Sequence, residues 1–520
     1  MRVDLSERWI SYSPEGEEET TFWVRSHYCT HLQDQIIDAL AGCVSSFFER
    51  EQGSDELFEQ ILSFSGIVVQ QGSNLWALSA YHGLCPLYVD IENNVVSDEW
   101  ERLSKTARYS REVISSLCRQ AFIPGTQTID HQVIKLIDGD LWVLEDGLTS
   151  ISKRYLKLTF SSKRHSADHD LLEELDKLMT DVLADLKVRC MGKTIFLSLS
   201  GGRDSILLAF LLKKADIDFV CFTYGKSGNK ELINARQAAK MLGLKHEFIE
   251  TSNFGSSVDI FIKSQGWRVP IFNGHDSVIR LCNREDKDVV IVDGQTGDWL
   301  SGGHLKWGKS ETATFEACAI EHLCDQSLDG TWDEATYPIG SIFPAPSTYS
   351  EFFNSCEDRT KSYYFDYFIE MHIRQTHCVN PSMRALESAK VTIESPFWDR
   401  RLIKWFASLK IHHLKDQAIY SEYTRVYFPE FFETFEQKRR RNVSLSLRFF
   451  QRLCSWVLPG KFSAMIRHLC VYFSHYGDQV KGFSLLAWTR LLNNYPFISE
   501  GRTVVQIQAG RLLSELQNDH

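Results

Sequence analysis

The 520-residue sequence has no excess of positive charge: 57 lysines and arginines stand against 68 aspartates and glutamates, a formal net charge of −11. Nucleic-acid-binding domains usually present a basic stripe, often interleaved with aromatic residues. The one basic cluster here, at residues 438–441, is short. We therefore expect no nucleic-acid partner.

The sequence also lacks a hydrophobic run of membrane-spanning length. Residues 453–471 are mildly apolar but interrupted by Gly460, Lys461 and Arg467, which favours an amphipathic, buried helix. Residues 1–12 are polar and charged, unlike a secretory signal peptide. These absences predict a cytoplasmic protein without membrane insertion.

No two of the 13 cysteines form a C-x-x-C pair. An odd number of scattered cysteines is typical of reduced thiols in a cytosol rather than of a disulfide framework. Cys318 and Cys324 lie six residues apart without nearby histidines, so we interpret them as packing residues rather than zinc ligands.

The chain length favours two domains, with a polar linker at 161–170. The first domain, residues 1–160, alternates short apolar runs with turn signals, which predicts an α+β fold rich in antiparallel strands. Its clearest runs are 65–69, 75–78, 86–89 and 141–144.

The second domain, residues 171–520, alternates strands with helices, which predicts a doubly wound parallel sheet with ligands at the carboxyl ends of its strands. Beyond residue 343 the pattern is mostly helical. The predicted strands are 219–224, 246–249 and 289–293, and the clearest helices are 230–242 and 315–323.

One segment carries the strongest chemical signal. An apolar run, 194–199, ends in Ser200, Gly201 and Gly202, and a helix-compatible run, 206–214, follows. Read as strand, loop and helix, it directs backbone N–H groups and the positive end of a helix at one point, where the glycines let the backbone curl around an anion. The hydroxyls of Ser200 and Ser205 add donors.

Asp204 lies inside this anion-binding loop. A carboxylate would repel a bare phosphate, so it makes most sense as a ligand of phosphate-bound Mg²⁺. The loop is therefore predicted to hold a nucleotide pyrophosphate.

Residues 303–310 formally fit a second phosphate motif, the Walker A pattern G-x-x-x-x-G-K-S. A true P-loop follows an apolar strand directly, whereas the nearest predicted strand here ends near Asp293. We interpret this match as accidental.

A better partner for the first loop follows the strand 289–293. Its residues 294–304 are rich in glycine and contain Asp298. If the two strands are neighbours in a parallel sheet, Asp204 and Asp298 clamp one Mg²⁺–pyrophosphate between them.

Here the residues carry a family resemblance. The loop at 200–205 resembles the S-G-G-x-D-S loop of N-type ATP pyrophosphatases, and 294–304 resembles the G-D-G-G-D-E-L-F-G-G-Y element of asparagine synthetases. Residues 394–399 and 436–438 are similar to the R-V-P-F-L-D and R-Q-K segments of that family.

The N-terminal domain resembles the glutaminase domain of the same family. Residues 83–88, 121–128 and 134–139 match its G-x-x-P-L-Y, Y-x-P-G-x-x-T and I-x-K-L-P-P-G patterns. The resemblance implies an Ntn-hydrolase-like β-sandwich followed by an ATP-pyrophosphatase domain with a helical C-terminal extension.

The resemblance also implies roles for individual residues, with ATP and Mg²⁺ as cofactors. The metal ligands would be Asp204 and Asp298, and Lys438 would stabilise the pentavalent phosphate and then the adenylate. The remaining nucleotide-binding positions would be Ser200, Gly201, Gly202, Ser205, Phe222, Tyr224, Gly225, Gly294 and Gly297.

The chain departs from the family in its glutaminase half. The family's nucleophile is a cysteine exposed by removal of the initiator methionine, but Arg2 follows Met1 here and the first cysteine is Cys29. A family-type N-G-E segment is also missing. The degenerate domain is therefore expected not to hydrolyse glutamine.

The synthetase half also departs from the pattern of the asparagine synthetase family. Trp299 and Gln295 stand where asparagine synthetases have acidic residues, and Glu394 replaces an arginine. These changes indicate an altered acceptor side, with a substrate other than free aspartate.

The resemblance predicts an AMP- and pyrophosphate-forming ligase. It would adenylate a small-molecule or peptide carboxylate and form an amide with an amine, or with ammonia supplied free or by a partner glutaminase. One alternative is an intramolecular cyclase of the β-lactam synthetase or lasso-peptide cyclase type, since those relatives also lack the N-terminal cysteine. Another is a catalytically inactive, nucleotide-binding regulator. The sequence leaves open a homodimer and the identity of the acid.

Overall fold

The computed structural model describes the chain in seventeen segments. They are residues 2–5, 9–13, 20–26, 65–79, 85–114, 123, 125–136, 139–153, 168–225, 227, 230–250, 275–285, 288–305, 314–326, 358–371, 375 and 391–436. The predicted helix at 453–471 and the basic cluster at 438–441 lie outside them. Within them, no helix combines the length and apolar character needed to cross a membrane.

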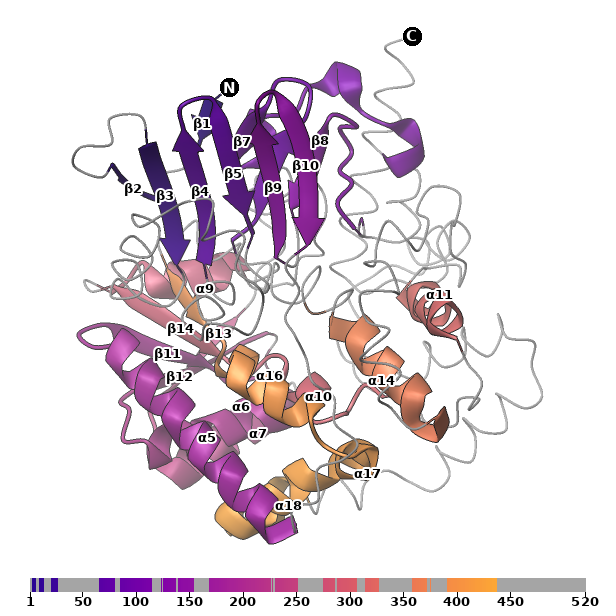
Figure 1. Ribbon diagram of the computed structural model, residues 1–520. Coiled ribbons are helices and arrows are strands. Elements are labelled where there is room, and N and C mark those ends of the chain that lie inside the picture. Colours follow the sequence, from indigo (N-terminus) through magenta and orange to yellow (C-terminus); the bar gives the residue numbers. More distant parts are fainter. Residues whose placement is uncertain are drawn as a thin grey trace, which may run out of the picture.

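The N-terminal part contains two β-sheets, seen in the upper half of Figure 1. One has the order β1-β7-β6-β8 and the other the order β10-β9-β5-β4-β3-β2. All neighbours are antiparallel except β1 and β7, which are parallel. The strands are β1 Arg2–Asp4, β2 Ile10–Tyr12, β3 Thr20–Ser26, β4 Ser65–Gln71, β5 Asn74–Leu78, β6 Leu87–Asp90, β7 Val95–Ser97, β8 Val133–Leu136, β9 Asp140–Glu145 and β10 Leu148–Lys153.

Alternating side chains of these strands build a shared core between the two sheets. Leu75 and Ala77 of β5 contribute from the six-stranded sheet, and Leu87 and Val89 of β6 from the four-stranded sheet. The apolar runs predicted from the sequence at 65–69, 75–78, 86–89 and 141–144 therefore fall on β4, β5, β6 and β9.

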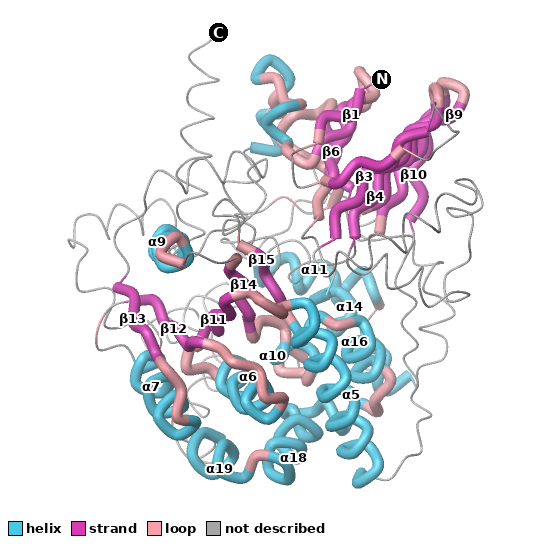
Figure 2. The backbone as a smooth tube through the Cα atoms, turned by 90° about the vertical axis from the view of Figure 1, so that its left-hand side faces the viewer, coloured by secondary structure: helices cyan, strands magenta, loops and turns pink. Residues whose placement is uncertain are grey.

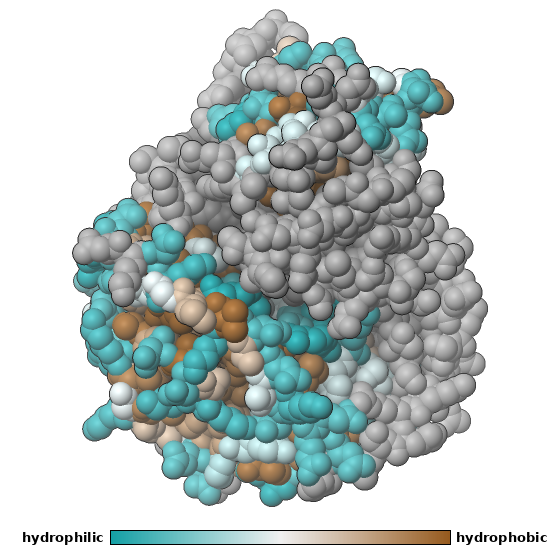
Figure 3. Space-filling model, turned by 60° about the vertical axis from the view of Figure 1, so that its left-hand side comes forward, coloured by the Kyte–Doolittle hydropathy of each residue, from teal (hydrophilic) through white to brown (hydrophobic). Residues whose placement is uncertain are grey.

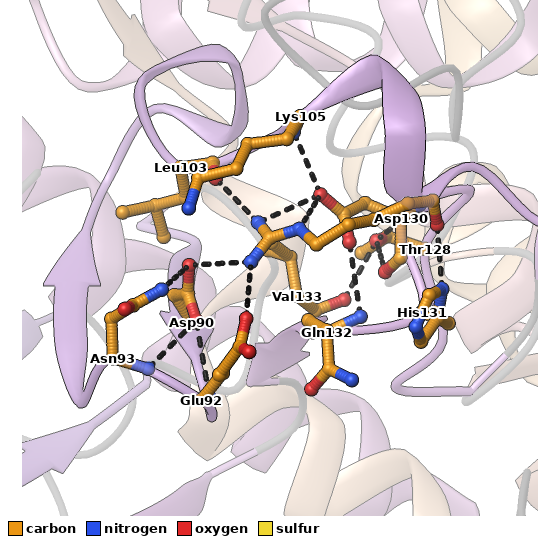
Figure 4. A network of polar contacts seen from close by, with 11 residues as sticks. Asp90, Glu92, Asn93, Leu103, Lys105, Thr128, Asp130, His131, Gln132 and Val133 are labelled. Atoms are coloured by element: carbon orange, nitrogen blue, oxygen red, sulfur yellow. Dashed lines mark hydrogen bonds and ion pairs between the residues drawn. The ribbon is translucent and has the colours of Figure 1, made fainter.

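A buried ion network ties the turns of the four-stranded sheet together (Figure 4). Arg108, at the end of the short helix η2 (Thr106–Arg108), reaches Asp90 at 3.0 Å and Asp130 at 2.9 Å. It also donates to the Leu103 carbonyl at 2.8 Å. Asp90 and Asp130 are almost fully buried, so a single guanidinium neutralises two carboxylates in the interior. The other short helix here, η1, is Trp100–Arg102.

The C-terminal part is built on a five-stranded sheet of order β13-β12-β11-β14-β15, in which all neighbouring strands are parallel. This confirms the parallel sheet predicted from the sequence. Its strands are β11 Thr194–Ser198, β12 Val220–Gly225, β13 His246–Glu250, β14 Val289–Asp293 and β15 Thr392–Glu394.

Helices cover both faces of this sheet. Figure 2 shows α9 on one side and α5, α6 and α7 on the other. The α9 side packs Val278 and Leu281 against Phe222 and Ile291. The opposite side belongs to the largest hydrophobic cluster, which also includes residues of the N-terminal part.

The helices have the following bounds. They are α5 Asp168–Arg189, α6 Arg203–Lys214, α7 Lys230–Leu242, α9 His275–Cys282, α10 Gly297–Leu300, α11 Phe315–Gln326, α14 Asp358–Glu370, η6 Pro396–Trp398, α16 Arg400–Ala407, α17 Ile411–Leu414, η7 Lys415–Gln417, α18 Ala418–Tyr427, α19 Pro429–Phe431 and η8 Phe432–Glu436. Helices α7 and α11 begin where the sequence predicts.

The surface of the C-terminal part mixes residue types. On the face drawn in Figure 3, brown hydrophobic patches in the lower half are interrupted by teal polar residues. Exposed apolar side chains include Val188, Met191 and Ile233, at 63%, 76% and 58% exposure. They lie on or next to α5 and α7, and scattered exposure of this kind is normal for a protein surface.

Candidate active site

The candidate site lies where two neighbouring strands end. β11 and β14 pair in parallel register, so that Ser198 is opposite Asp293. The strand order reverses direction between them, because β12 and β13 extend to one side and β15 to the other. Crevices that bind ligands form at such switch points, where consecutive loops diverge.

The loop after β11 has the shape that an anion cradle requires. Gly201 has a φ of 71°, and a Cβ there would lie 2.1 Å from the Glu231 carbonyl oxygen. Only glycine fits this position. Ser205 accepts from the Ser200 N–H at 3.2 Å and donates to the Gly202 carbonyl at 3.1 Å, so its hydroxyl shapes the loop.

The loop after β14 packs directly on the first loop. A Cβ on Gly294 would lie 2.8 Å from the Ser205 nitrogen, and one on Gly297 would lie 2.9 Å from Cγ of Asp204. Both glycines are therefore required by close approach rather than by a positive φ. Between them, Thr296 has a φ of 82°, which is rare for a β-branched residue.

Both predicted carboxylates are held by neighbouring side chains. The Tyr420 hydroxyl donates to Asp204 Oδ1 at 3.0 Å. The Gln417 amide donates to Asp298 Oδ1 at 2.7 Å, and His304 Nε2 lies 3.2 Å from Asp298 Oδ2. Segments far apart in the sequence thus fix the orientation of each carboxylate.

These loops border a cavity of about 330 Å³. A cavity of this size is at the lower end of the range for small-molecule sites. Its lining residues are Ser198, Ser200, Gly202, Arg203, Asp204, Ser205, Phe222, Tyr224, Val278, Ile291, Asp293, Gly294, Gln295, Thr296, Asp298, Trp299, His304 and Gln375.

The cavity brings together eight of the residues selected from the sequence: Ser200, Gly202, Asp204, Ser205, Phe222, Tyr224, Gly294 and Asp298. Gly201, Gly225 and Gly297 lie outside its lining, where Gly201 and Gly297 serve the close packing of the loops. Lys438 lies outside the described residues.

Arg203, inside the glycine loop, is turned toward the C-terminal helices. It forms an ion pair with Glu436 and donates to Gln417 at 2.7 Å and to Ser421 at 3.0 Å. Its guanidinium also lies 4.4 Å from the ring centroid of Tyr420. Arg203 therefore anchors the loop to the segment just before Lys438, and its charge is already paired.

A chain of imidazoles and carboxylates runs inward from Asp298. His304 Nδ1 lies 2.8 Å from Glu370 Oε1, and the other Glu370 oxygen lies 3.6 Å from His322. His322 in turn lies 3.4 Å from Asp366. Glu370, His322 and Asp366 are all buried, so this network braces the acidic side of the cavity from behind.

Asp293 is a buried carboxylate in the cavity that the sequence analysis treated only as the end of a strand. Burial raises its pKa to about 7, and hydrogen bonds from the backbone N–H groups of Gln295 and Gly294 offset only part of that effect. Among the described residues, no lysine, arginine or histidine forms an ion pair with it. Near neutral pH it is therefore divided between its protonated and ionised forms.

Two residues that depart from the family pattern, Glu394 and Trp299, make structural contacts. Glu394 pairs with Arg189 of α5 at 3.1 Å and is not part of the cavity lining, and its expected effect on the acceptor side stays a prediction. Trp299 borders the cavity but is 1% exposed. Its Nε1 donates to the Tyr367 carbonyl at 3.0 Å, and its ring lies 4.7 Å from the Tyr367 ring.

Sequence reasoning missed Ser198, Asp293 and Gln375 as cavity residues. The first two carry a readable signal, because each is a polar residue ending an otherwise apolar strand at the carboxyl edge of the sheet. Gln375 has no such signal, and only the tertiary structure brings it to Thr296, whose hydroxyl donates to it at 3.3 Å.

No group of three or more histidine, cysteine, aspartate or glutamate side chains within the described segments could hold a metal by itself. The two carboxylates in the cavity, Asp204 and Asp298, form a different kind of donor set. Mg²⁺ is commonly bound by one or two carboxylates together with substrate phosphates and water, so these residues fit a phosphate-bound Mg²⁺.

Comparisons with known proteins leave the function open. Residues 193–298, which run from just before β11 to Asp298, match the model of a family of unknown function, DUF7411. A search of curated proteins found no match.

Three solved structures illustrate the structural matches. An NH3-dependent NAD synthetase from Campylobacter jejuni is 14% identical, covering 41% of this chain and 95% of its own, with a TM-score of 0.21. A U34-tRNA thiolase from Methanococcus maripaludis is 10% identical, covering 56% and 84%, with a TM-score of 0.22. An NMN synthetase from Francisella tularensis is 14% identical, covering 45% and 94%, with a TM-score of 0.18. Likenesses with identities and TM-scores this low do not assign a function to this chain.

Proposed function

We propose that the protein is an ATP-dependent ligase that cleaves ATP between its α- and β-phosphates and forms an amide. The observation that carries this proposal is the interlocking of two glycine loops at one edge of the parallel sheet. Asp204 from one loop and Asp298 from the other line the same cavity there. A tight turn alone would require neither the two carboxylates nor their convergence.

The pyrophosphate would bind at the N-terminus of α6, where free backbone N–H groups and the helix dipole favour an anion. Asp204 and Asp298 would hold Mg²⁺ against it, with their orientations set by Tyr420 and Gln417. The bound metal would neutralise the charge that develops as pyrophosphate leaves. The resemblance to asparagine synthetases assigns stabilisation of the transferred phosphate to Lys438.

In the first step, the carboxylate of the substrate would attack the α-phosphorus, and pyrophosphate would leave. In the second step, an amine would attack the acyl carbon of the acyl-adenylate and expel AMP. The N-terminal part would act without glutamine hydrolysis, as a degenerate Ntn-hydrolase-like domain, because its sequence has no N-G-E segment of the type that forms the family's glutamine pocket. The nitrogen would then come from ammonia or from an amine.

Carboxylate-dependent exchange of labelled pyrophosphate into ATP tests the activation step, with pools of candidate acids as substrates. Asp204→Asn and Asp298→Asn should each lower the exchange rate at least about a hundredfold, because each removes a charge that positions the metal. Asp216→Asn is the matched control, since Asp216 is fully exposed just beyond the end of α6 and its exchange rate should not change.

ATP binding by the wild-type protein without exchange for any acid would instead support the nucleotide-binding regulator. Once an acid is known, the mass of the product separates the two ligase candidates. Addition of an ammonia-derived or amine-derived nitrogen indicates intermolecular amide formation. Loss of water alone indicates a cyclase of the β-lactam synthetase or lasso-peptide cyclase type.

A further inference from the structure

Three cavity residues form one row across three neighbouring strands. Ser198 of β11 is the register partner of Phe222 on β12 and of Asp293 on β14. Register partners in a parallel sheet direct their side chains to the same face, and all three residues line the cavity. The row thus presents an aromatic ring, a hydroxyl and a carboxyl group in that order.

The aromatic end of the row offers an apolar surface. The rings of Phe222 and Tyr224 lie 6.4 Å apart, and Val278 and Ile291 line the same part of the cavity. Phe222, Val278 and Ile291 belong to the cluster packed between the sheet and α9. Flat apolar and aromatic surfaces of this kind suit a heterocyclic base.

The other end of the row is acidic and has acceptor capacity to spare. Asp293 is 6% exposed, and its Oδ1 accepts from the Gln295 N–H at 3.0 Å. A carboxylate offers about four lone-pair sites. Two backbone N–H groups therefore leave room for further donors from a ligand in the cavity.

The ionised surroundings determine which ligand group can approach this carboxyl. The other ionisable residues that line the cavity are Arg203, Asp204, Tyr224, Asp298 and His304. Arg203 is paired with Glu436, Glu394 on β15 is paired with Arg189, and Arg280 of α9 is exposed and donates to Ser277. No free cation accompanies Asp293 within the described part of the cavity, so a phosphate would be repelled there and a neutral hydroxyl would be favoured.

The spacing of the row matches a nucleoside. Neighbouring strands lie about 4.8 Å apart, so two strand spacings separate Phe222 from Asp293 by about 10 Å. A base on the aromatic end places its sugar over Ser198 and the sugar hydroxyls toward Asp293. We infer that Asp293 accepts a hydrogen bond from a ribose hydroxyl of the bound nucleotide, 2′ or 3′, and selects nucleotides that carry this hydroxyl over those that lack it. This inference rests on the proposed binding of ATP.

The test compares the dissociation constants of ATP, 2′-deoxy-ATP and 3′-deoxy-ATP, each with Mg²⁺, measured by calorimetry on the full-length protein. At pH 8, where most of Asp293 is ionised, the wild type should bind ATP at least about tenfold more tightly than one of the two analogues, since a hydrogen bond to a charged group is lost. Asp293→Ala should bind all three nucleotides about equally. The ratio within one variant does not depend on the fraction of active protein.

Two further variants complete the design. Asp293→Asn keeps an acceptor for the Gln295 N–H and so protects the fold, and its discrimination should fall to a few-fold. Asp216→Asn removes a fully exposed carboxylate outside the cavity and should keep the discrimination of the wild type. Equal binding of the three nucleotides by the wild type, or full discrimination by Asp293→Ala, would overturn this inference alone. Failure of the wild type to bind ATP at all would overturn the proposed function and the inference with it.

Discussion

Asp90 and Asp293 are a matched pair of buried aspartates in two different regions. Each ends a strand, β6 or β14, and they are 3% and 6% exposed. Each also accepts from the backbone N–H two residues later, at 3.1 Å from Glu92 and at 3.0 Å from Gln295. The two carboxyl groups share this local contact, but Asp90 also accepts from the backbone and side-chain N–H groups of Asn93, at 3.0 Å and 2.9 Å.

Their pKa values nevertheless move in opposite directions. Burial acts to raise the pKa of Asp90, but hydrogen bonds from Asn93 and the Arg108 guanidinium outweigh it and hold that pKa below its usual value. Burial raises the pKa of Asp293 to about 7, because only backbone N–H groups oppose it. The Asn93 donors and the Arg108 guanidinium make Asp90 part of the framework. Asp293 has neither among the described residues and can receive a ligand.

Removal of the Arg108 guanidinium should lower the free energy of unfolding more than any other change proposed here. Arg108→Met leaves Asp90 and Asp130 buried without a counter-ion, and should lower the free energy of unfolding by about 3–5 kcal/mol. Urea titration followed by tryptophan fluorescence measures this loss. Arg102→Met is the control, because its ion pairs with Asp4 and Glu99 are more exposed, and it should lose less than about 1 kcal/mol. Equal losses in the two variants would contradict the assigned role of Arg108.

Ionisation of Asp293 should lower the free energy of unfolding by an intermediate amount that depends on pH. The pKa of Asp293 is about 7 in the folded state, above its ordinary value of 3.8. At pH values between these two, the folded protein therefore keeps a proton on Asp293 that the unfolded chain has released. Stability is therefore lost as the pH rises through this window, by about 2 kcal/mol between pH 5.5 and pH 8. Asp293→Asn cannot ionise and should gain in Tm relative to the wild type over that range.

Asp90→Asn is the matched control for this pH series. The pKa of Asp90 is lowered, so its contribution is present above the ordinary value and is lost only as the pH falls through the folded-state pKa. The Tm difference between Asp90→Asn and the wild type should stay constant from pH 5.5 to pH 8. If Asp293→Asn behaved in the same way, the contrast between the two aspartates would fail.

The smallest change in the free energy of unfolding is expected for Glu92, at the exposed edge of the Arg108 network. Glu92 lies 3.3 Å from Arg108, but its side chain is 60% exposed. Glu92→Gln should change the free energy of unfolding by less than about 0.5 kcal/mol, because water screens the pair. A loss in the same urea titration as large as that of Arg108→Met would show that burial is not what makes this network strong.

The sequence by itself determined the local structure of the C-terminal part. Helix α7 and strand β14 have the predicted bounds, and the glycine loop joins β11 to α6. These features follow from hydrophobic periodicity and from glycines at positions that no other residue fits, and both are properties of short segments.

Only the tertiary structure decided which side chains share the cavity. Asp293 faces Ser198 because β14 pairs with β11 across a separation of 95 residues. Arg203 is held toward the C-terminal helices by its ion pair with Glu436, and Glu394 is paired with Arg189 on α5. Strand register and distant ion pairs set these positions, and neither leaves a periodic pattern in the chain. The sequence determined that an anion-binding loop forms, and tertiary pairing decided which carboxylates line the cavity beside it.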